Sequence, residues 1–385
     1  MDEGGRSATS LAAEVSAVPL SDEPTAGAQS QTGAGCDAAT GESRTLEIAV
    51  SWRNPAEVFV QAPLARALLA ATPLRPLARL RRKAIRTLFH VVHQRLGMPA
   101  RAIMCVVDGS IVKVDAANTG FLDYAARNQR GDGCEPEVSG LLVGLAAQLR
   151  VVYDVGANWG YYPLLLGTEP RFQGTIHAFE INPRTAADLR GIVVGAGLTR
   201  RVAVHDFGLS DRNGEARLSR EKHSFLSRIV DPDDRRPADV VRVRRLDDLG
   251  LPPPDLIKID VEGHEAGVLA GAKGTLVRDQ PLVIIESWYQ PERVGAMLAP
   301  LRLLAELGYR LHRLIWRPMP ESADGPAVRR GTLLLIPLTP SDRPAIHEPL
   351  NLLAVPPRRS AWFAGDARAR QPQRETAGVR AAIGC

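Results

Sequence analysis

The residues from Leu149 to Gly160 constrain the fold of this chain more than any other segment. The apolar run Leu149–Tyr153 leads directly into Asp154-Val155-Gly156-Ala157-Asn158-Trp159-Gly160. This order predicts a buried strand, then a turn containing two glycines, then a helix that begins near Trp159. Glycine allows a ligand to approach the backbone where a Cβ atom would collide with it. The segment therefore predicts a site for a nucleoside-type cofactor at the carboxyl end of a strand.

The spacing of the glycines indicates which cofactor is bound. The dinucleotide pattern G-x-G-x-x-G requires glycine at positions 158 and 161, where this chain has Asn158 and Tyr161. The turn therefore favours S-adenosylmethionine over a nicotinamide dinucleotide. We assign four residues to the wall around the methionine end of that cofactor, namely Asp154, Gly156, Asn158 and Gly160.

Length and composition are typical of one main domain with extensions. The chain has 385 residues, of which 45% are hydrophobic and 24% charged, which is enough for a substantial core. We expect a cytoplasmic protein without a membrane span, because no apolar run approaches about 18 residues and the start lacks the pattern of a secretory signal. The four cysteines are scattered, so neither a disulfide framework nor a zinc site is predicted.

Strand and helix patterns alternate from Leu149 onward, which predicts a mostly parallel sheet with helices on both faces. A short hairpin, Glu215–Ser219 with Val240–Arg244, interrupts the alternation. Either Gly331–Pro337 or Leu350–Val355 supplies the last strand. The other predicted strands are Arg150–Val155, Thr175–Glu180, Arg201–Asp206, Asp255–Asp260, Leu282–Glu286 and Tyr309–Ile315. The predicted helices are Trp159–Leu166, Arg184–Gly195, Glu265–Val277 and Glu292–Leu307.

An acidic residue ends the second strand. Glu180 lies in the run His177-Ala178-Phe179-Glu180-Ile181-Asn182-Pro183, at the position where a carboxylate accepts hydrogen bonds from both ribose hydroxyls of a nucleoside. The alternative is that this acid caps the following helix. Asn182 is a second candidate, either for orienting Glu180 or for contacting the adenosine.

Polar side chains alternate with apolar ones in Leu256–Glu265. Lys258, Asp260 and Glu262 share one face of a strand, and we expect them at the reacting end of the cleft. Lys258 and Asp260 are expected to pair, because a buried lysine needs a counter-charge. The alternative role for this run is an ion pair between neighbouring loops. Glu262 and His264 are the candidate general bases, while Asp260 positions the acceptor or cofactor.

No metal site is predicted in this chain. Glu286 would lie beside Asp260 if their strands are neighbours, and such a carboxylate pair holds either a divalent ion or sugar hydroxyls. A methyl donor with a sulfonium needs no metal, so we favour the hydroxyls. His90 and His93 lack a third ligand in sequence.

A strongly basic segment extends from Pro63 to Arg101 and contains no Asp or Glu. Apolar residues recur at helical spacing within it, at Leu77, Leu80, Ala84, Leu88, Val91 and Val92. A basic amphipathic helix of this kind either lies on an anionic membrane or grips a phosphate-bearing carrier. The simpler interpretation, which we favour, is a solvated helix whose apolar stripe packs on the core. Nucleic-acid binding is not expected, because the arginines have no interleaved aromatic residues.

These motifs, in this order, resemble the FkbM family of S-adenosylmethionine-dependent methyltransferases. The matching phrases are Tyr153–Tyr162, His177–Pro183 and Asp255–Glu265, supported by Leu246-Asp247-Asp248-Leu249 and by Pro281–Glu286. Cys134 precedes Glu135-Pro136 where the family commonly has an aromatic residue. The resemblance covers residues 118–356, and the basic segment and both ends of the chain lie outside it.

The resemblance implies a class I, Rossmann-like α/β methyltransferase fold, with a mostly parallel seven-stranded sheet and an antiparallel final strand, Leu350–Val355. It implies O-methylation of a hydroxyl on a sugar, polysaccharide or secondary metabolite. Around this domain we expect a disordered tail (1–44), an N-terminal extension (45–117) and a flexible tail (357–385). Two rival functions stay open, a nicotinamide-dependent oxidoreductase and a non-catalytic scaffold that docks on membrane or anionic glycan through residues 63–101.

Overall fold

The computed structural model has two compact units, Met1–Glu42 and Ser43–Cys385. The described residues belong to the second unit. The predicted tail 1–44 and the segment beyond residue 363 lie outside the described residues. These are residues 45–61, 63–64, 67, 76–106, 110–115, 134–220, 227–230, 233–319 and 328–363.

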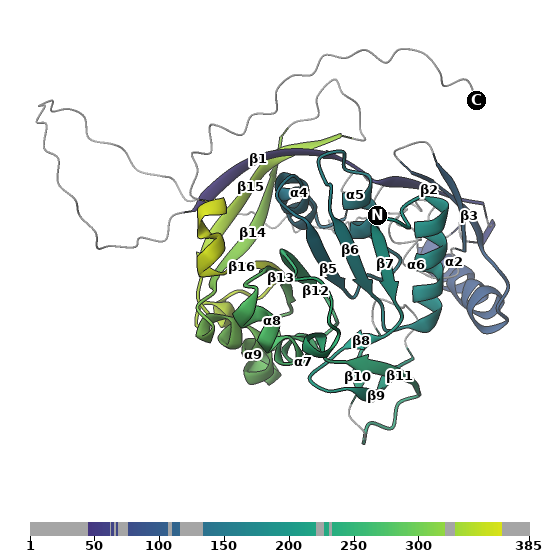
Figure 1. Cartoon of the computed structure of the whole chain (residues 1–385). Coiled ribbons are helices and arrows are strands. Elements are labelled where there is room, and N and C mark those ends of the chain that lie inside the picture. The colour runs from purple at the N-terminus through teal and green to yellow at the C-terminus, as the bar shows by residue number, and fades with distance from the viewer. Residues whose placement is uncertain are drawn as a thin grey trace, which may run out of the picture. The chain divides into compact units, whose positions relative to one another are not determined.

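A nine-stranded sheet organises the domain, in the order β1-β15-β14-β16-β13-β12-β5-β6-β7 (Figure 1). Its parallel half confirms the predicted strands to within a residue or two at each end. Adjacent strands in this half pair in register, for example Lys258 with Asp154 and with Ile284. The parallel strands are β5 (Val151–Val155), β6 (Thr175–Phe179), β7 (Val202–His205), β12 (Leu256–Ile259) and β13 (Leu282–Ser287).

The other half of the sheet resolves the choice of final strand. β16 (Leu350–Val355) inserts antiparallel between β13 and β14 (Arg310–Pro318), as the resemblance implied. The rival candidate is also a strand, because Gly331–Pro337 lies within β15 (Val328–Leu338), which pairs with the outer edge of β14. The predicted seven strands are thus extended by two more.

The outermost strand comes from the predicted N-terminal extension, residues 45–117. β1 (Leu46–Arg53) pairs with β15 over its whole length. The side chains of β1 alternate between half-buried and exposed, so one face of the strand packs on the domain. Trp52 is buried there, edge-on to Trp316 at 4.8 Å between ring centroids.

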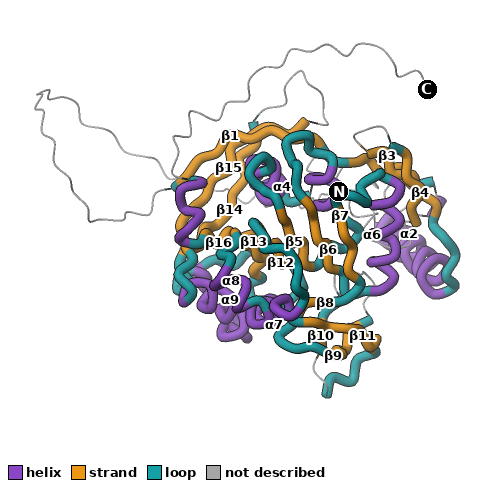
Figure 2. Tube along the Cα trace, in the orientation of Figure 1, coloured by secondary structure: helices purple, strands orange, loops and turns teal. Residues whose placement is uncertain are grey.

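Helices cover both faces of the sheet (Figure 2). On one face, α4 (Pro136–Leu145), α5 (Tyr161–Gly167) and α6 (Pro183–Gly195) contribute to a core with Val152 and Ile176. On the other face, Tyr153 and Ile257 pack with the second set of helices. The predicted helix Glu265–Val277 is broken at Ala272, so this set consists of α7 (Glu265–Gly271), α8 (Lys273–Arg278) and α9 (Val294–Glu306).

The predicted hairpin between β7 and β12 is confirmed. β9 (Gly214–Ser219) pairs antiparallel with β11 (Ala238–Arg244). Two short strands, β8 (Gly208–Leu209) and β10 (Ile229–Val230), complete a four-stranded sheet. Figure 1 shows this small sheet beyond the carboxyl ends of β5, β6 and β7, where it can wall a cleft.

Residues 56–115 include a three-stranded sheet, β2 (Ala56–Val60), β3 (Arg101–Val106) and β4 (Ile111–Asp115). Its β4 packs on α6, where a Cβ atom on Gly195 would lie 2.8 Å from Val112. Helix α2 (Pro76–Phe89) continues as the π-helix η1 (His90–Arg95). No described helix has the length and apolar character needed to cross a membrane.

The orientation of this basic helix corrects the favoured interpretation of its apolar stripe. Ala84 and Leu88 are exposed, whereas Phe89 and His93 are buried. The stripe predicted to pack on the core therefore faces solvent at two of its members. The rotation of the helix about its axis decides which side chains are buried. The sequence pattern did not specify this rotation, because Phe89 and His93 form a competing face.

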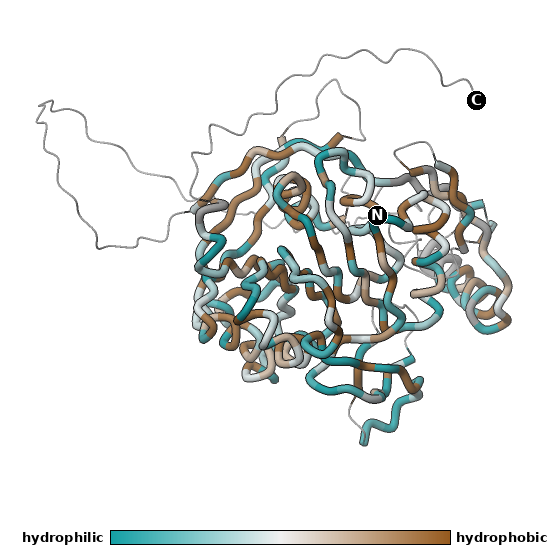
Figure 3. Tube along the Cα trace, viewed as in Figure 1, coloured by the Kyte–Doolittle hydropathy of each residue, from teal (hydrophilic) through white to brown (hydrophobic). Residues whose placement is uncertain are grey.

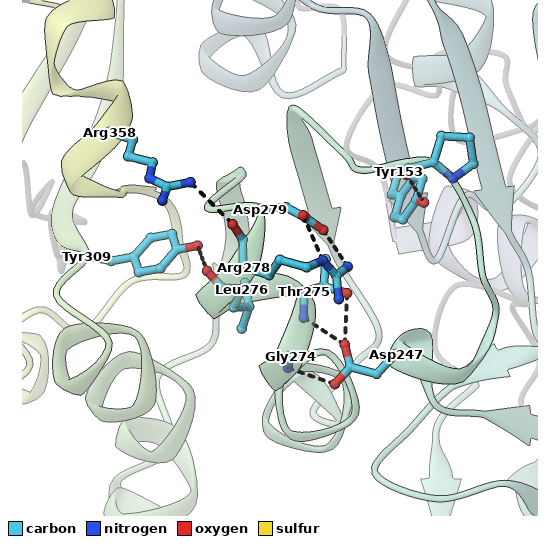
Figure 4. A network of polar contacts seen from close by, with 10 residues as sticks. Tyr153, Asp247, Gly274, Thr275, Leu276, Arg278, Asp279, Tyr309 and Arg358 are labelled. Atoms are coloured by element: carbon cyan, nitrogen blue, oxygen red, sulfur yellow. Dashed lines mark hydrogen bonds and ion pairs between the residues drawn. The ribbon is translucent and has the colours of Figure 1, made fainter.

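A polar network fixes the end of the described chain to the domain (Figure 4). Asp247, in the 3-10 turn Leu246–Asp248, accepts hydrogen bonds from the N–H groups of Gly274 and Thr275 and so caps α8. Arg358 donates to the carbonyl oxygen of Arg278, and Arg359 donates to Asp255. Residues 357–363, which the sequence assigned to a flexible tail, thus begin with an anchored 3-10 helix, Pro357–Trp362.

We predict that Trp52→Ala lowers the free energy of unfolding of the whole domain by about 3–5 kcal/mol, because it leaves a cavity against Trp316. Denaturant unfolding followed by circular dichroism measures this value. Arg53→Ala, on the exposed side of the same strand, is the control and should change stability by less than about 0.5 kcal/mol. Equal stability of the two variants would contradict the placement of β1 in the domain.

Candidate cofactor and catalytic site

A cleft of about 720 Å³ opens at the carboxyl ends of β5, β6 and β12. The small sheet contributes its far wall through Leu218 and Ile229. The strands supply most of the polar lining, because parallel strands end at one edge of the sheet. Among the predicted site residues, the cleft wall contains Gly156, Asn158, Glu180, Asp260, Glu262 and His264.

Gly156 is required by a close approach of two strands. Its φ is +83°, and a Cβ atom there would lie 1.8 Å from the carbonyl oxygen of Asp260. Gly160, with φ +99°, meets Leu189 of α6 in the same way, at 2.4 Å. The two glycines that were predicted to admit a cofactor therefore also allow the turn to pack against the end of β12 and against α6. A larger residue at either position would displace one of these contacts.

Asn158 lies between these glycines in a left-handed conformation, with φ +51°. Its side-chain oxygen is buried and has no hydrogen-bond partner. An unpartnered buried amide oxygen costs free energy unless a ligand or water satisfies it. The residue is therefore poised to accept a hydrogen bond from a molecule in the cleft.

Glu180 joins the ends of β5 and β6. Its carboxylate accepts one hydrogen bond from the N–H of Asn158 at 2.9 Å and one from the N–H of Asn182 at 2.8 Å. Burial raises the pKa of Glu180 to about 7, and these two hydrogen bonds oppose the increase. Each oxygen retains a lone pair, so the side chain can hold both loops and also accept ligand hydroxyls.

Asn182 has a structural role for its side chain. Its amide oxygen accepts from the N–H groups of Arg184 and Thr185 and so caps α6. The predicted orientation of Glu180 by Asn182 is present, but through the backbone N–H. The helix cap that the sequence offered as an alternative for Glu180 is made by Asn182.

Asp154 and Lys258 form a buried charged pair on adjacent strands. The Nζ atom of Lys258 lies 3.9 Å from Asp154 Oδ1 and 3.1 Å from Asp260 Oδ2. It also lies 4.7 Å from the centroid of the Tyr162 ring. Burial disfavours the charge of Lys258, but the surrounding carboxylates outweigh it and hold the lysine pKa above its ordinary value. The predicted pairing of Lys258 with Asp260 is confirmed.

The carboxylate of Asp154 is not satisfied by this pair alone. Both of its oxygens are buried without a hydrogen-bond partner. Burial raises the pKa of Asp154 to about 6, although Lys258 opposes the shift. The group therefore retains acceptor capacity for a donor that approaches from the cofactor side.

Asp260 and Glu286 form a second carboxyl pair at the ends of β12 and β13. They share a hydrogen bond, and Lys258 holds the pKa of Asp260 below its ordinary value despite burial. Burial, followed by the charge of Asp260, raises the pKa of Glu286 to about 9. The pair therefore favours a form with one proton near neutral pH, which lies in the hydrogen bond between the two carboxyl groups, and the remaining lone pairs are acceptors.

The two predicted bases differ in their surroundings. Glu262, with φ +53°, lines the cleft, and burial raises its pKa to about 7. His264 is hydrogen-bonded to Ser210 Oγ through Nε2 at 2.9 Å, and burial lowers its pKa. Glu262 is thus the freer of the two and has a pKa near that of an effective base at neutral pH.

Sequence reasoning missed the network that closes the site from the other side. Glu135, at the start of α4, accepts a hydrogen bond from the hydroxyl of Tyr162 and another from Asn351 Nδ2. Asn351 also donates to Glu137 at 2.8 Å. Glu135 has φ +38°, which is uncommon for a residue other than glycine. The available signal was the acidic pair around Pro136, but its partner lies 216 positions away in β16.

The acids Asp260, Glu262 and Glu286 are close enough to consider a metal ion. One oxygen from each lies within 4.8 Å of the others. Lys258 already neutralises Asp260, however, and a proton shared with Glu286 reduces the charge further. Both effects weaken the attraction of this group for a cation. The absence of a metal stays a prediction.

The strand order, the antiparallel β16 and the cleft at the carboxyl edge define a class I methyltransferase fold. The family model described as Methyltransferase FkbM domain matches residues 154–311. The 2-O-methyltransferase NoeI of Sinorhizobium fredii is 31% identical over 179 residues, which cover 41% of this chain and 70% of that protein. The chain therefore belongs to the FkbM methyltransferase family.

Two further proteins are similar to this chain. The Hexuronic acid methyltransferase AglP of Haloferax volcanii is 28% identical over 189 residues, which cover 48% of this chain and 74% of that protein. A solved Methyltransferase FkbM from Methylobacillus flagellatus is 16% identical, with a TM-score of 0.33. That alignment covers 57% of this chain and 61% of the other.

Gly156→Ala should lower the free energy of unfolding by about 3 kcal/mol or more, because it forces a backbone contact apart. Gly263→Ala is the matched control, since Gly263 also has positive φ, +98°, but nothing lies within 4 Å of its Cβ position. The control should cost only the backbone strain, about 1–2 kcal/mol. Denaturant titration of both variants measures the difference, and equal losses would contradict the close approach to Asp260.

Proposed function

We propose that this protein transfers a methyl group from S-adenosylmethionine to a hydroxyl oxygen of a sugar-containing acceptor. The observation that carries the proposal is the buried Glu180 carboxylate, which lines the cleft beside a turn whose glycines exclude side chains. A carboxylate at the end of the second strand recognises the two hydroxyls of a ribose. Membership of the FkbM family supports methyl transfer as the reaction.

The residues around the cleft fit S-adenosylmethionine at both of its polar ends. Glu180 would hold the ribose, and the unpartnered Asn158 oxygen and Asp154 carboxylate would accept from the amino group of the methionine moiety. When bound, this cofactor supplies an electrophilic methyl group on a sulfonium sulfur. The positive charge of the sulfonium and amino groups complements a cleft edge rich in Asp and Glu.

Hydroxyl groups are the acceptor that the reacting end suits best. The Asp260–Glu286 pair keeps acceptor lone pairs beyond the hydrogen bond that its two carboxyl groups share, and such acceptors can bind the hydroxyls of a sugar. Two relatives are named a hexuronic acid methyltransferase and a 2-O-methyltransferase, and these names support a sugar hydroxyl.

The proposed chemistry needs one base and one positioning group. Asp260, held ionised by Lys258, orients the acceptor hydroxyl. Glu262, with its pKa near 7, removes the hydroxyl proton as the new carbon–oxygen bond forms. His264 is occupied by Ser210 and plays a smaller part than its residue type suggested.

The two rival functions receive less support. A nicotinamide-dependent oxidoreductase lacks the glycine that the dinucleotide turn requires at position 158, where Asn158 has φ +51°. A non-catalytic scaffold would leave the raised pKa values of Glu180, Glu262 and Glu286 without a use. The names of the two relatives, which are both methyltransferases, also favour neither of these functions.

Glu180→Gln should weaken binding of S-adenosylhomocysteine about 100-fold or more, because it removes two charged hydrogen bonds worth roughly 1.5–3 kcal/mol each. The variant should also bind the 2′,3′-dideoxy analogue as well as the parent, whereas the wild type discriminates strongly between them. Isothermal titration calorimetry measures all four affinities. Persistent discrimination in the variant would remove the ribose assignment.

The same experiment has a pH dependence with a defined sign. The pKa of Glu180 is raised to about 7, so the carboxylate loses its charge as pH falls below that value. Affinity for S-adenosylhomocysteine should therefore decrease between pH 8 and pH 6 in the wild type. Glu180→Gln should lack this component, while Glu306→Gln, an exposed acid on α9, should retain it.

Glu262→Gln should lower kcat by about 10²–10⁴-fold, the usual contribution of a general base. Its affinity for S-adenosylhomocysteine should stay within about threefold of the wild type, since the ribose contacts are intact. Labelled-methyl transfer to glycans extracted from the producing cells measures the rate. In the wild type the rate should rise with pH through about 7, where Glu262 ionises, and the variant should lack this rise.

His264→Ala provides the comparison for the base assignment. Because His264 is tied to Ser210, we expect its kcat to fall by less than about tenfold. A large loss in His264→Ala combined with a small loss in Glu262→Gln would transfer the role of base to the histidine.

A further inference from the structure

The end of the basic helix presents apolar side chains to solvent in an ordered turn. Leu88 is 49% exposed, Leu96 67% and Met98 54%. Large apolar side chains exposed in a group, rather than singly, mark interaction surfaces. We call Leu88, Leu96 and Met98 the apolar tip.

Backbone and side-chain hydrogen bonds hold the apolar tip together. The N–H of Leu96 donates to Val91 O at 2.9 Å, and the N–H of Met98 donates to Val92 O at 3.2 Å. The buried His93 adds a contact between its Nδ1 and Met98 O at 2.8 Å. These contacts hold Leu96 and Met98 against η1, the last turns of the helical segment.

The charges on the segment that carries the apolar tip are all of one sign. Lys83, Arg86 and Arg95 are exposed on the same helical segment, and no Asp or Glu occurs between Pro63 and Arg101. A solvated helix in a soluble protein normally mixes both signs. A segment that combines exposed apolar side chains with cations and no acids complements a surface that is both anionic and apolar beneath.

We propose that the segment Lys83–Met98 docks the protein on the surface of an anionic lipid bilayer. In this arrangement the apolar tip enters the acyl boundary while the three cations contact lipid phosphates. The docking is peripheral, since no described helix is able to span a membrane. It is independent of the proposed methyl transfer, because none of these residues lines the cleft.

Cosedimentation of the full chain with vesicles tests this docking. Anionic vesicles of phosphatidylcholine with about 30% phosphatidylglycerol should bind the protein. Vesicles of pure phosphatidylcholine should bind it at least about tenfold more weakly. The triple variant Leu88→Gln, Leu96→Gln, Met98→Gln should lose at least about tenfold in vesicle affinity. The triple variant Lys83→Gln, Arg86→Gln, Arg95→Gln should lose about as much or more, roughly fivefold per cation.

Matched controls use exposed residues elsewhere in the domain. Val194→Gln with Val277→Gln removes exposed apolar side chains, and Lys273→Gln with Arg302→Gln removes exposed cations. Both should bind vesicles like the wild type, and circular dichroism melts identify any variant that fails to fold. If a docking variant fails to fold, the single changes Leu96→Gln and Arg95→Gln replace it.

Three outcomes would overturn the docking. The first is equal binding to anionic and neutral vesicles, and the second is no loss in the apolar variant. The third is binding to soluble dextran sulfate that competes fully with vesicles and depends only on the cations, because that result describes an anionic glycan site. Loss of methyl transfer with intact vesicle binding would bear on the proposed function alone.

Discussion

One buried cation, Lys258, stabilises the cluster of carboxylates at the candidate reacting end of the cleft. Lys258 is only 3% exposed, and its ammonium lies between Asp154 and Asp260. Carboxylates from neighbouring strands cannot all stay charged in a buried site without such a partner. The proton shared by Asp260 and Glu286 reduces the remaining repulsion. The positive charge of Lys258 and the proton on the Asp260–Glu286 pair thus offset the negative charges of the cluster.

The same arrangement separates two jobs that we propose for the acids of the site. Glu180 and Asp154 keep acceptor capacity, which the proposed cofactor site would use. Asp260, Glu262 and Glu286 lie close together, we propose them for the acceptor hydroxyl, and their pKa values are driven apart. Such divergence between neighbouring carboxyl groups allows one to donate and another to accept at a single pH.

Two strands and a small sheet lie outside the seven strands that the resemblance implied. β1 and β15 extend the sheet edge, and Trp52 and Trp316 pack there against α4, where Gly140 leaves them room. The small sheet β2-β3-β4 covers α6 and carries the basic helix. These parts support a domain whose catalytic edge is formed by other strands, so they are free to acquire a separate task such as docking.

Local patterns predicted much of the site, because its residues follow strand ends in the chain. The turn around Gly156, the acid Glu180 and the run from Lys258 to Glu262 all come from single segments. Hydrophobic periodicity specifies a buried strand, and the residues after it must then meet at one sheet edge. The capping of α6 by Asn182 rather than by Glu180 was harder to predict, since either side chain can cap a helix.

The sequence by itself determined the parallel sheet, the hairpin and the position of the turn from Gly156 to Gly160, because each depends on residues that are neighbours in the chain. Only the tertiary structure decided the pairing of β1 with β15, since any free strand edge can accept a partner. It also decided the contact of Glu135 with Asn351 and the sharing of a proton between Asp260 and Glu286. Those properties arise from distances between segments far apart in sequence, and burial sets their strength.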